Sequence, residues 1–133
     1  MERIRLIQKF NDYKKAVERL GEVLEADLQN EFIYDAAIQR FEFTYELSCK
    51  LIKGFLSYSG IAGVLTPREV FKEAFSVGLI QEGQKWIEML KDRNLTSHVY
   101  DEEMAKDIYA RVKSIYMELF VALVKKIEVE LKK

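Results

Sequence analysis

The sequence predicts an all-α protein, an up-and-down four-helix bundle with one or two additional short helices. Apolar residues recur at alternating steps of three and four through most of the chain, which is the spacing of one helix face. Leu, Ile, Glu and Lys are abundant, and the 133 residues include one proline and six glycines, which favours helices. No change in composition marks a boundary, so residues 1–133 are expected to form a single helical domain around one core.

Two long helices are expected in the first half of the chain. The first begins about Leu6, and because Gly21 weakens its pattern it should end between Gly21 and Leu28. The second keeps the apolar spacing from Tyr34 to Phe55 and should be followed by a glycine-containing loop. A second apolar line widens the face of this helix, as a central bundle helix or a dimer surface requires. That line consists of Phe43 and Leu47.

Two shorter helices should follow. The stretch from Thr66 to Glu69, Thr-Pro-Arg-Glu, has the pattern of a capping box with proline at the first helical position. Gly78 should end the helix that begins there. Gly83 marks another short connection, after which a helical segment leads to Arg93.

The last helix is expected from Asp101 almost to Lys133, a length of about 45 to 50 Å. One apolar line along it would serve the bundle core. A second line lies beside the first and exceeds what one core requires, which predicts self-association through the long helices. The second line consists of Tyr109, Tyr116, Phe120 and Val124.

Charge and composition exclude several classes of function. Lys plus Arg number 21 against 22 for Asp plus Glu, so no strong overall field steers nucleic acid and any RNA contact must be local. The single cysteine, Cys49, excludes an internal disulfide, fits a reducing cytosol and is expected to be a small buried hydrophobe. With a single histidine, His98, a zinc site built by the protein is not expected, and neither is any other cofactor.

The amino terminus has charged residues but no apolar segment of the kind that signal peptides contain. No window approaches the roughly 18 apolar residues of a membrane span. The sequence is therefore expected to belong to a soluble cytoplasmic protein without membrane association.

The stretch from Arg93 to Tyr100, Arg-Asn-Leu-Thr-Ser-His-Val-Tyr, lies where one helical pattern stops and another starts. On a continuous helix, five steps would leave Arg93 and His98 about 140° apart. Thr96 and the serine after it are good N-cap residues, and the acids at 101–103 suit a first turn, so a helix break is predicted near Thr96. Such a break could turn a guanidinium and an imidazole into one cleft.

These two side chains suit phosphodiester cleavage. An imidazole can give or take a proton near neutral pH, and a guanidinium fork binds a phosphate through two hydrogen bonds. In this scheme His98 handles the proton of a ribose 2′-hydroxyl or of the leaving oxygen, and Arg93 holds the scissile phosphate. The alternative is that Arg93 is a surface cation near a helix end and His98 a polar residue beside a cap.

Other polar residues could assist. Asp101 and Glu102 follow His98 by three and four positions, so they could orient the imidazole or simply be solvated first-turn acids. On the second helix Asp35 and the pair Arg40 and Glu42 could form surface ion pairs. One of these carboxylates could instead enter the cleft from the neighbouring helix.

The stretch from Arg93 to Tyr100 matches the R-x4-H-x-Y signature of HEPN ribonuclease toxins of the HepT kind. The segments 35–47 and 86–94 around it resemble nucleotidyltransferase substrate-binding subunits, which are small helical partners of minimal nucleotidyltransferases. The resemblance extends from about residue 34 to residue 109.

The resemblance implies a homodimer in which two R-x4-H motifs meet across the interface in a composite RNA cleft. Cleavage in such proteins is independent of metal. Arg93 and His98 take the catalytic positions, and Asn94 takes the polar position that often follows the arginine. Tyr100 falls on the tyrosine that the cognate nucleotidyltransferase antitoxin modifies with AMP, which blocks the toxin.

Two functions from different classes follow as hypotheses. The first is a ribonuclease toxin of a two-gene toxin–antitoxin system, neutralised by AMP transfer to Tyr100. The second is a non-catalytic subunit that binds a minimal nucleotidyltransferase and presents substrate to it. A helical interaction module with a vestigial motif is a third. The expected partners are a second copy of the chain, a cognate minimal nucleotidyltransferase and RNA.

Overall fold

The described part of the chain contains helices and no strands in a computed structural model, which confirms the predicted all-α class. The structure describes residues 1–26, 32–64, 66–98 and 101–133. Its elements in chain order are α1 (Glu2–Leu24), α2 (Ile33–Tyr58), α3 (Pro67–Ser76), α4 (Gly83–Thr96), α5 (Glu102–Arg111), the π-helical segment η1 (Val112–Tyr116) and α6 (Met117–Leu131).

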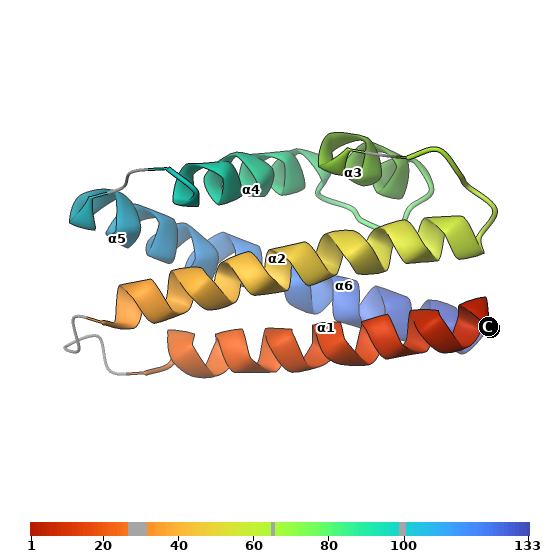
Figure 1. Ribbon diagram of the computed structural model, residues 1–133, viewed down its shortest axis with the longest axis horizontal. Coiled ribbons are helices and arrows are strands. Elements are labelled where there is room, and N and C mark those ends of the chain that lie inside the picture. Colours follow the sequence, from red (N-terminus) through yellow and green to blue (C-terminus); the bar gives the residue numbers. More distant parts are fainter. Residues whose placement is uncertain (27–31, 65, 99–100) are drawn as a thin grey trace.

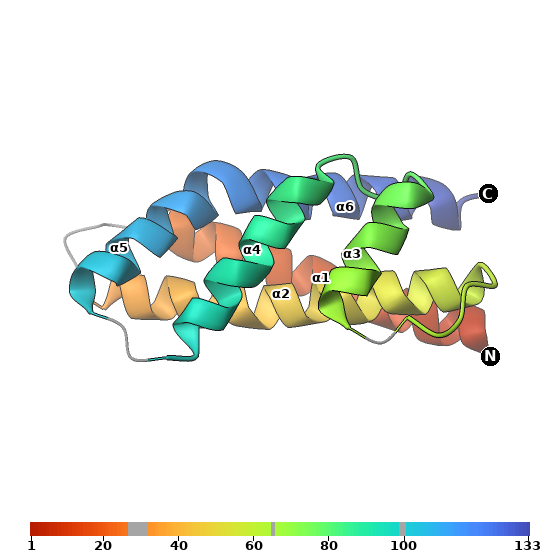
Figure 2. The ribbon, with the colours of Figure 1, turned by 90° about the horizontal axis from the view of Figure 1, so that it is seen from above.

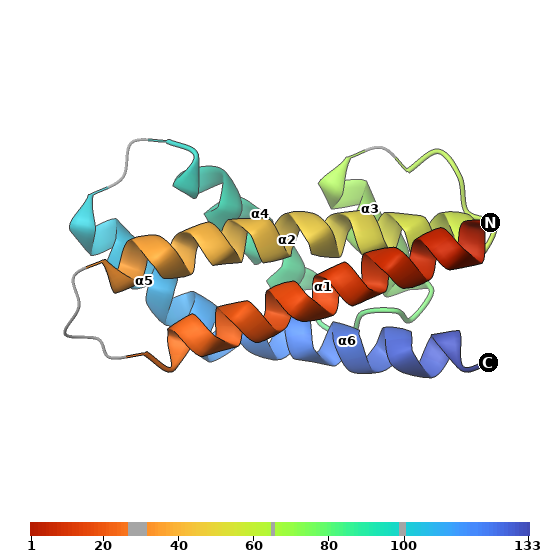
Figure 3. The same ribbon diagram turned by 60° about the horizontal axis from the view of Figure 1, so that its bottom comes forward.

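Consecutive long elements run in alternating directions, as an up-and-down bundle requires (Figure 1). The helices α1 and α2 pack along most of their length, and the continuous stretch α5–η1–α6 lies against both. The shorter helices α3 and α4 cross one side of α2 at an angle (Figure 2). Both chain termini lie at the same end of the bundle (Figure 3), where the Arg3 guanidinium donates to the carbonyl of Leu131 at 2.6 Å.

Several predicted helix ends are confirmed. The first helix ends at Leu24, inside the expected window. The Thr66 side chain accepts a hydrogen bond from the backbone N–H of Glu69 at 3.2 Å, and Pro67 is the first residue of α3. Gly78 follows that helix with φ of +80°, a left-handed conformation that glycine adopts without a steric penalty.

An aromatic core joins the helices and fixes α4 over α2. The indole of Trp86 lies 5.2 Å from the ring of Phe71 and 5.9 Å from that of Phe120, measured between centroids. Phe41 of α2 stacks on Tyr116 at 5.7 Å. These residues are almost completely buried, and each aromatic pair adds about 0.5–1.5 kcal/mol beyond the apolar area it removes from water.

None of the helices in the described part of the chain combines the length and apolar character that crossing a membrane requires.

The carboxy-terminal helix is not one regular α-helix, and its second apolar line is not left free for self-association. A π-helical turn interrupts it at 112–116; such turns admit one extra residue and shift the helix face. Tyr109, Tyr116 and Phe120, from the second apolar line, are buried inside the protomer, and Val124 is partly buried. The prediction that this line is surplus to the core is therefore wrong, because α5–η1–α6 packs against neighbours on two sides.

The predicted helix break lies close to the expected position, but the cap residue differs. Thr96 is the last residue of α4 instead of an N-cap, and its hydroxyl has two acceptors at 2.7 Å, the carbonyl of Arg93 and the carboxylate of Glu42. Asp101 caps α5, and its carboxylate accepts from the backbone N–H of Met104 at 2.8 Å.

Candidate functional site

Arg93 is held in place by side chains from its own helix and from α2. Its guanidinium lies 3.2 Å from the Glu42 carboxylate and 2.8 Å from the Glu46 carboxylate. It also donates to the hydroxyl of Ser97 at 2.7 Å. The side chain is about one-fifth exposed, at 20%. The fork is therefore oriented by fixed acceptors while part of it still faces solvent.

The two carboxylates belong to one face of α2, because residues four apart on a helix lie one turn above another. Glu42 also accepts a hydrogen bond from the buried Thr96 hydroxyl at 2.7 Å. This contact joins the end of α4 to the middle of α2. Sequence reasoning named Glu42 but missed Glu46, which the four-residue spacing from Glu42 could have indicated.

A second polar cluster, also missed by sequence reasoning, joins α4 to Arg111 of α5 and Tyr116 of η1. Asp92 is 6% exposed and accepts two hydrogen bonds from Arg111, at 2.7 Å from Nε and 2.9 Å from Nη2. The Tyr116 hydroxyl donates to the same carboxylate. Burial, and then the hydrogen bond to Asp92, raises the pKa of the Tyr116 hydroxyl, and the hydrogen bonds to Asp92 raise the pKa of the Arg111 guanidinium.

This cluster sets the rotation of α4. Asp92 points to η1 and Arg93 points to α2, so two adjacent residues anchor the helix on two neighbours. The sequence held a signal for this cluster: Asp92 lies three residues after Met89 and four before Thr96, on the same helix face as these two buried residues. A carboxylate on a buried helix stripe is rarely left unpaired.

A shallow groove of about 360 Å³ lies beside Arg93, between α2, α4 and the start of α3. Asn94, the predicted neighbour of the arginine, lines it. Cys49 lies there too, and burial raises its pKa to about 11, so the thiol is protonated at neutral pH and is a poor nucleophile. The groove is lined by Tyr45, Glu46, Cys49, Lys50, Pro67, Leu90, Arg93, Asn94 and Ser97.

The two residues of the predicted catalytic pair differ in their surroundings: Arg93 lines the groove, and His98 is exposed beyond the end of α4. His98 follows α4 by two positions, its side chain is exposed, and its backbone N–H donates to the carbonyl of Leu95 at 3.1 Å. It does not line the groove beside Arg93. Tyr100, the predicted modification site, lies outside the described residues.

The other predicted polar residues have structural contacts of their own. Asp101 caps α5, and Glu102 lies 3.4 Å from Lys106 in an exposed ion pair. Both contacts fit first-turn acids. The Arg40 guanidinium donates to the carbonyl of Arg19 at 2.7 Å, so it contacts α1 and is not brought to Arg93.

Asp35 is exposed in the first turn of α2. It lies seven residues before Glu42, which places it on the same helix face about 10 Å away along the axis. Of the three residues expected at a cleft on this helix, the structure thus brings Glu42 alone into contact with Arg93. Among the described residues, no group of three or more His, Cys, Asp or Glu side chains is arranged to hold a metal ion.

The fold and the site together define a class of protein: a small helical bundle in which two carboxylates of a long helix hold an arginine at the end of a short one, with a histidine five positions later. The chain belongs to the family described as nucleotidyltransferase substrate binding protein like, whose family model matches residues 8–129.

Individual relatives agree with this assignment. The chain is 33% identical over 117 residues to a Haemophilus influenzae protein named probable ribonuclease HepT, covering 82% of this chain and 80% of the relative. It also resembles a solved Haemophilus influenzae structure described as the fold of a substrate binding domain of a nucleotidyltransferase, with 27% identity, a TM-score of 0.70, and coverage of 98% and 99%.

A third similarity concerns the fold alone. The tri-AMPylated HEPN toxin of Shewanella oneidensis, solved in complex with MNT antitoxin, is 19% identical and has a TM-score of 0.77. The match covers 93% of this chain and 96% of that one.

Proposed function

We propose that this protein is a metal-independent endoribonuclease and the toxin of a two-gene toxin–antitoxin pair. The observation that carries the proposal is the Arg93 guanidinium, which Glu42 and Glu46 hold at the edge of an open groove. The R-x4-H-x-Y pattern and the similarity to a protein named probable ribonuclease HepT support it.

The chemistry assigns one task to each motif residue. The ribose 2′-oxygen attacks phosphorus and the bond to the 5′-oxygen breaks, which leaves a 2′,3′-cyclic phosphate and a 5′-hydroxyl. A base takes the proton of the 2′-hydroxyl, and an acid gives one to the leaving 5′-oxygen. Arg93 binds the phosphate oxygens and stabilises the charge that develops on them.

Two copies of the chain would supply both proton-transfer groups. The reaction needs a base and an acid, and each chain has a single histidine. Within one protomer the exposed His98 lies outside the Arg93 groove. A homodimer whose motifs meet across the interface would bring two imidazoles and two guanidinium groups to one RNA strand.

The activity is tested by incubating the purified protein with single-stranded RNA in the presence of EDTA. We expect cleavage that leaves 2′,3′-cyclic phosphate ends, because no step of the scheme uses a metal ion. The double variant Arg93→Ala/His98→Ala is the control and should leave the RNA intact. If the wild-type protein cuts no RNA when free of its partner, the alternative of a non-catalytic substrate-binding subunit replaces this proposal.

The second part of the proposal is regulation at Tyr100 by a minimal nucleotidyltransferase. The partner would transfer AMP from ATP to the phenol oxygen of Tyr100 and release pyrophosphate. Co-incubation with the partner and Mg-ATP is expected to add AMP to the protein and to abolish RNA cleavage. Mass spectrometry of the peptide that contains Tyr100 measures the first effect. A Tyr100→Phe variant that is still inhibited under these conditions would contradict this mechanism.

A further inference from the structure

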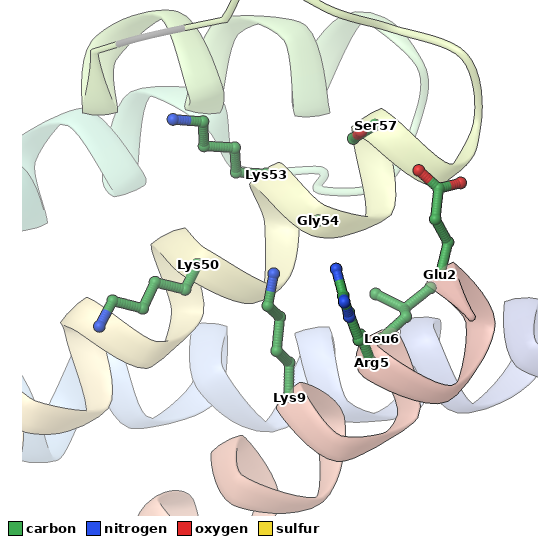
Figure 4. Close-up of a pocket in the computed structure, with 8 residues that line it drawn as sticks. All are labelled: Glu2, Arg5, Leu6, Lys9, Lys50, Lys53, Gly54 and Ser57. Atoms are coloured by element: carbon green, nitrogen blue, oxygen red, sulfur yellow. The ribbon is translucent and has the colours of Figure 1, made fainter.

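A groove with four basic side chains lies between the start of α1 and the second half of α2 (Figure 4). We call it the basic groove. Its volume is about 440 Å³. Its basic residues are Arg5 and Lys9 on α1 and Lys50 and Lys53 on α2, and it is completed by Glu2, Leu6, Gly54 and Ser57.

The absence of a side chain at Gly54 makes room for the basic groups. A Cβ at this position would lie 3.2 Å from Nζ of Lys9 and 3.7 Å from Leu6. Arg5 and Lys9 lie one turn apart on α1, and both rise toward α2 beside Gly54, whereas Lys50 and Lys53 project from α2 itself (Figure 4). The groove at Gly54 therefore has basic side chains from both helices.

The four basic side chains are exposed. None of them forms an ion pair with a carboxylate within residues 1–26, 32–64, 66–98 and 101–133. One acid, Glu2, lines the groove beside them. Arg5 and Lys9 are four residues apart on α1 and Lys50 and Lys53 three apart on α2, so the like charges of each pair repel one another. An anion bound beside them therefore lowers the free energy of the arrangement. In a chain with a net charge of −1, this is a local concentration of positive charge.

The basic groove and the groove beside Arg93 are neighbours on the surface of α2. Lys50 lines both of them. Glu46, Lys50 and Lys53 also share one face of α2, since their spacings are four and three residues. Lys53 lies about 10 Å beyond Glu46 along the helix axis. A polyanion that contacts Arg93 can therefore continue along α2 into the basic groove.

We propose that the basic groove binds backbone phosphates of the RNA strand whose scissile phosphate lies at Arg93. This inference rests on the proposed function and extends it to the length of RNA that the protein contacts. Among the residues that the structure describes, those that line the groove include no aromatic side chain on which a base could stack. The contacts are therefore with phosphates and carry no sequence preference.

The test compares two double variants that remove the same charge. Lys9→Ala/Lys53→Ala removes one basic side chain of the basic groove from each helix, and Lys113→Ala/Lys125→Ala removes two exposed lysines from η1 and α6. Both are made with His98→Ala, and their affinity for a labelled single-stranded RNA is measured by fluorescence anisotropy over a range of salt concentrations. Two lost phosphate contacts should reduce the salt slope by about 1.4 and weaken binding on the order of tenfold near 0.1 M salt.

Cleavage kinetics, with His98 intact, connect the basic groove to the Arg93 site. For a long RNA, kcat/KM should fall in Lys9→Ala/Lys53→Ala and remain at the wild-type value in the control pair. For a dinucleotide, which is too short to reach the basic groove, both pairs should match the wild-type protein.

The outcomes separate the two proposals. Equal RNA affinity and equal kinetics in the two double variants would overturn the basic groove while leaving the ribonuclease intact. Absence of any His98-dependent cleavage would overturn the proposed function and, with it, the link from the groove to Arg93. If the groove variant binds RNA normally but loses the nucleotidyltransferase, the surface is a protein-docking site and the inference is wrong.

Discussion

Replacing His98 with alanine is expected to reduce the rate of RNA cleavage by about 10²- to 10⁴-fold, the usual contribution of a general acid or base. The free energy of unfolding should change by less than about 0.5 kcal/mol, because the imidazole is exposed and contributes no packing to the core. Cleavage rates of a defined RNA in EDTA and urea denaturation of the same preparations measure the two effects.

Arg93→Lys tests the other residue of the motif. Lysine keeps the positive charge but loses the planar fork that contacts Glu42, Glu46 and Ser97 together, so cleavage should fall while RNA binding persists. If His98→Ala retained wild-type cleavage, the histidine would have no role in proton transfer. If stability fell in parallel with activity, the loss would be a folding effect.

Replacing Asp92 with alanine is expected to lower the free energy of unfolding by about 2–4 kcal/mol. The change leaves the buried hydroxyl of Tyr116 without its acceptor and removes both hydrogen bonds to Arg111. Urea denaturation at neutral pH measures the effect. Cleavage should also fall at temperatures where the variant is folded, because α4 loses the contact that sets the direction of Arg93.

Arg111→Ala tests how much of this loss in the free energy of unfolding comes from the contact between Asp92 and Arg111. The Arg111 side chain is 40% exposed, so its loss removes a partly solvated charge and should cost less than the loss of Asp92. Asp92→Asn keeps an acceptor for Tyr116 and should lie between wild type and Asp92→Ala. A change below about 1 kcal/mol in Asp92→Ala would show that the cluster does not anchor α4.

The helices could be predicted from the sequence because their signals are local. The capping box at Thr66 and the run from Tyr34 to Phe55 act through residues three and four positions apart, and the structure confirms both. The sequence signals for the helix break after α4 were also local, but the contacts that Thr96 makes there were not. Thr96 has two acceptors within reach in the folded chain, and one of them, Glu42, lies 54 positions away.

The sequence could not show in the same way which apolar side chains are buried inside the protomer and which stay exposed. A sequence shows how wide an apolar face is, but it does not show how many neighbours cover it. Tyr116 and Phe120 were assigned to a dimer surface, whereas Phe41 and Trp86 cover them within the protomer. The expected homodimer therefore no longer follows from this apolar line, whereas Phe43 on α2, 60% exposed, keeps an apolar surface that a second copy could cover.

The sequence by itself determined the helices, the family and the motif that names Arg93 and His98. The tertiary structure decided which groups meet, Glu46 and Glu42 at Arg93 and Arg111 and Tyr116 at Asp92, and which lysines of α1 and α2 line one groove. The reason is physical. Helix formation depends on neighbours within one turn, whereas ion pairs, buried hydrogen bonds and shared grooves depend on distances that packing sets between segments far apart in the chain.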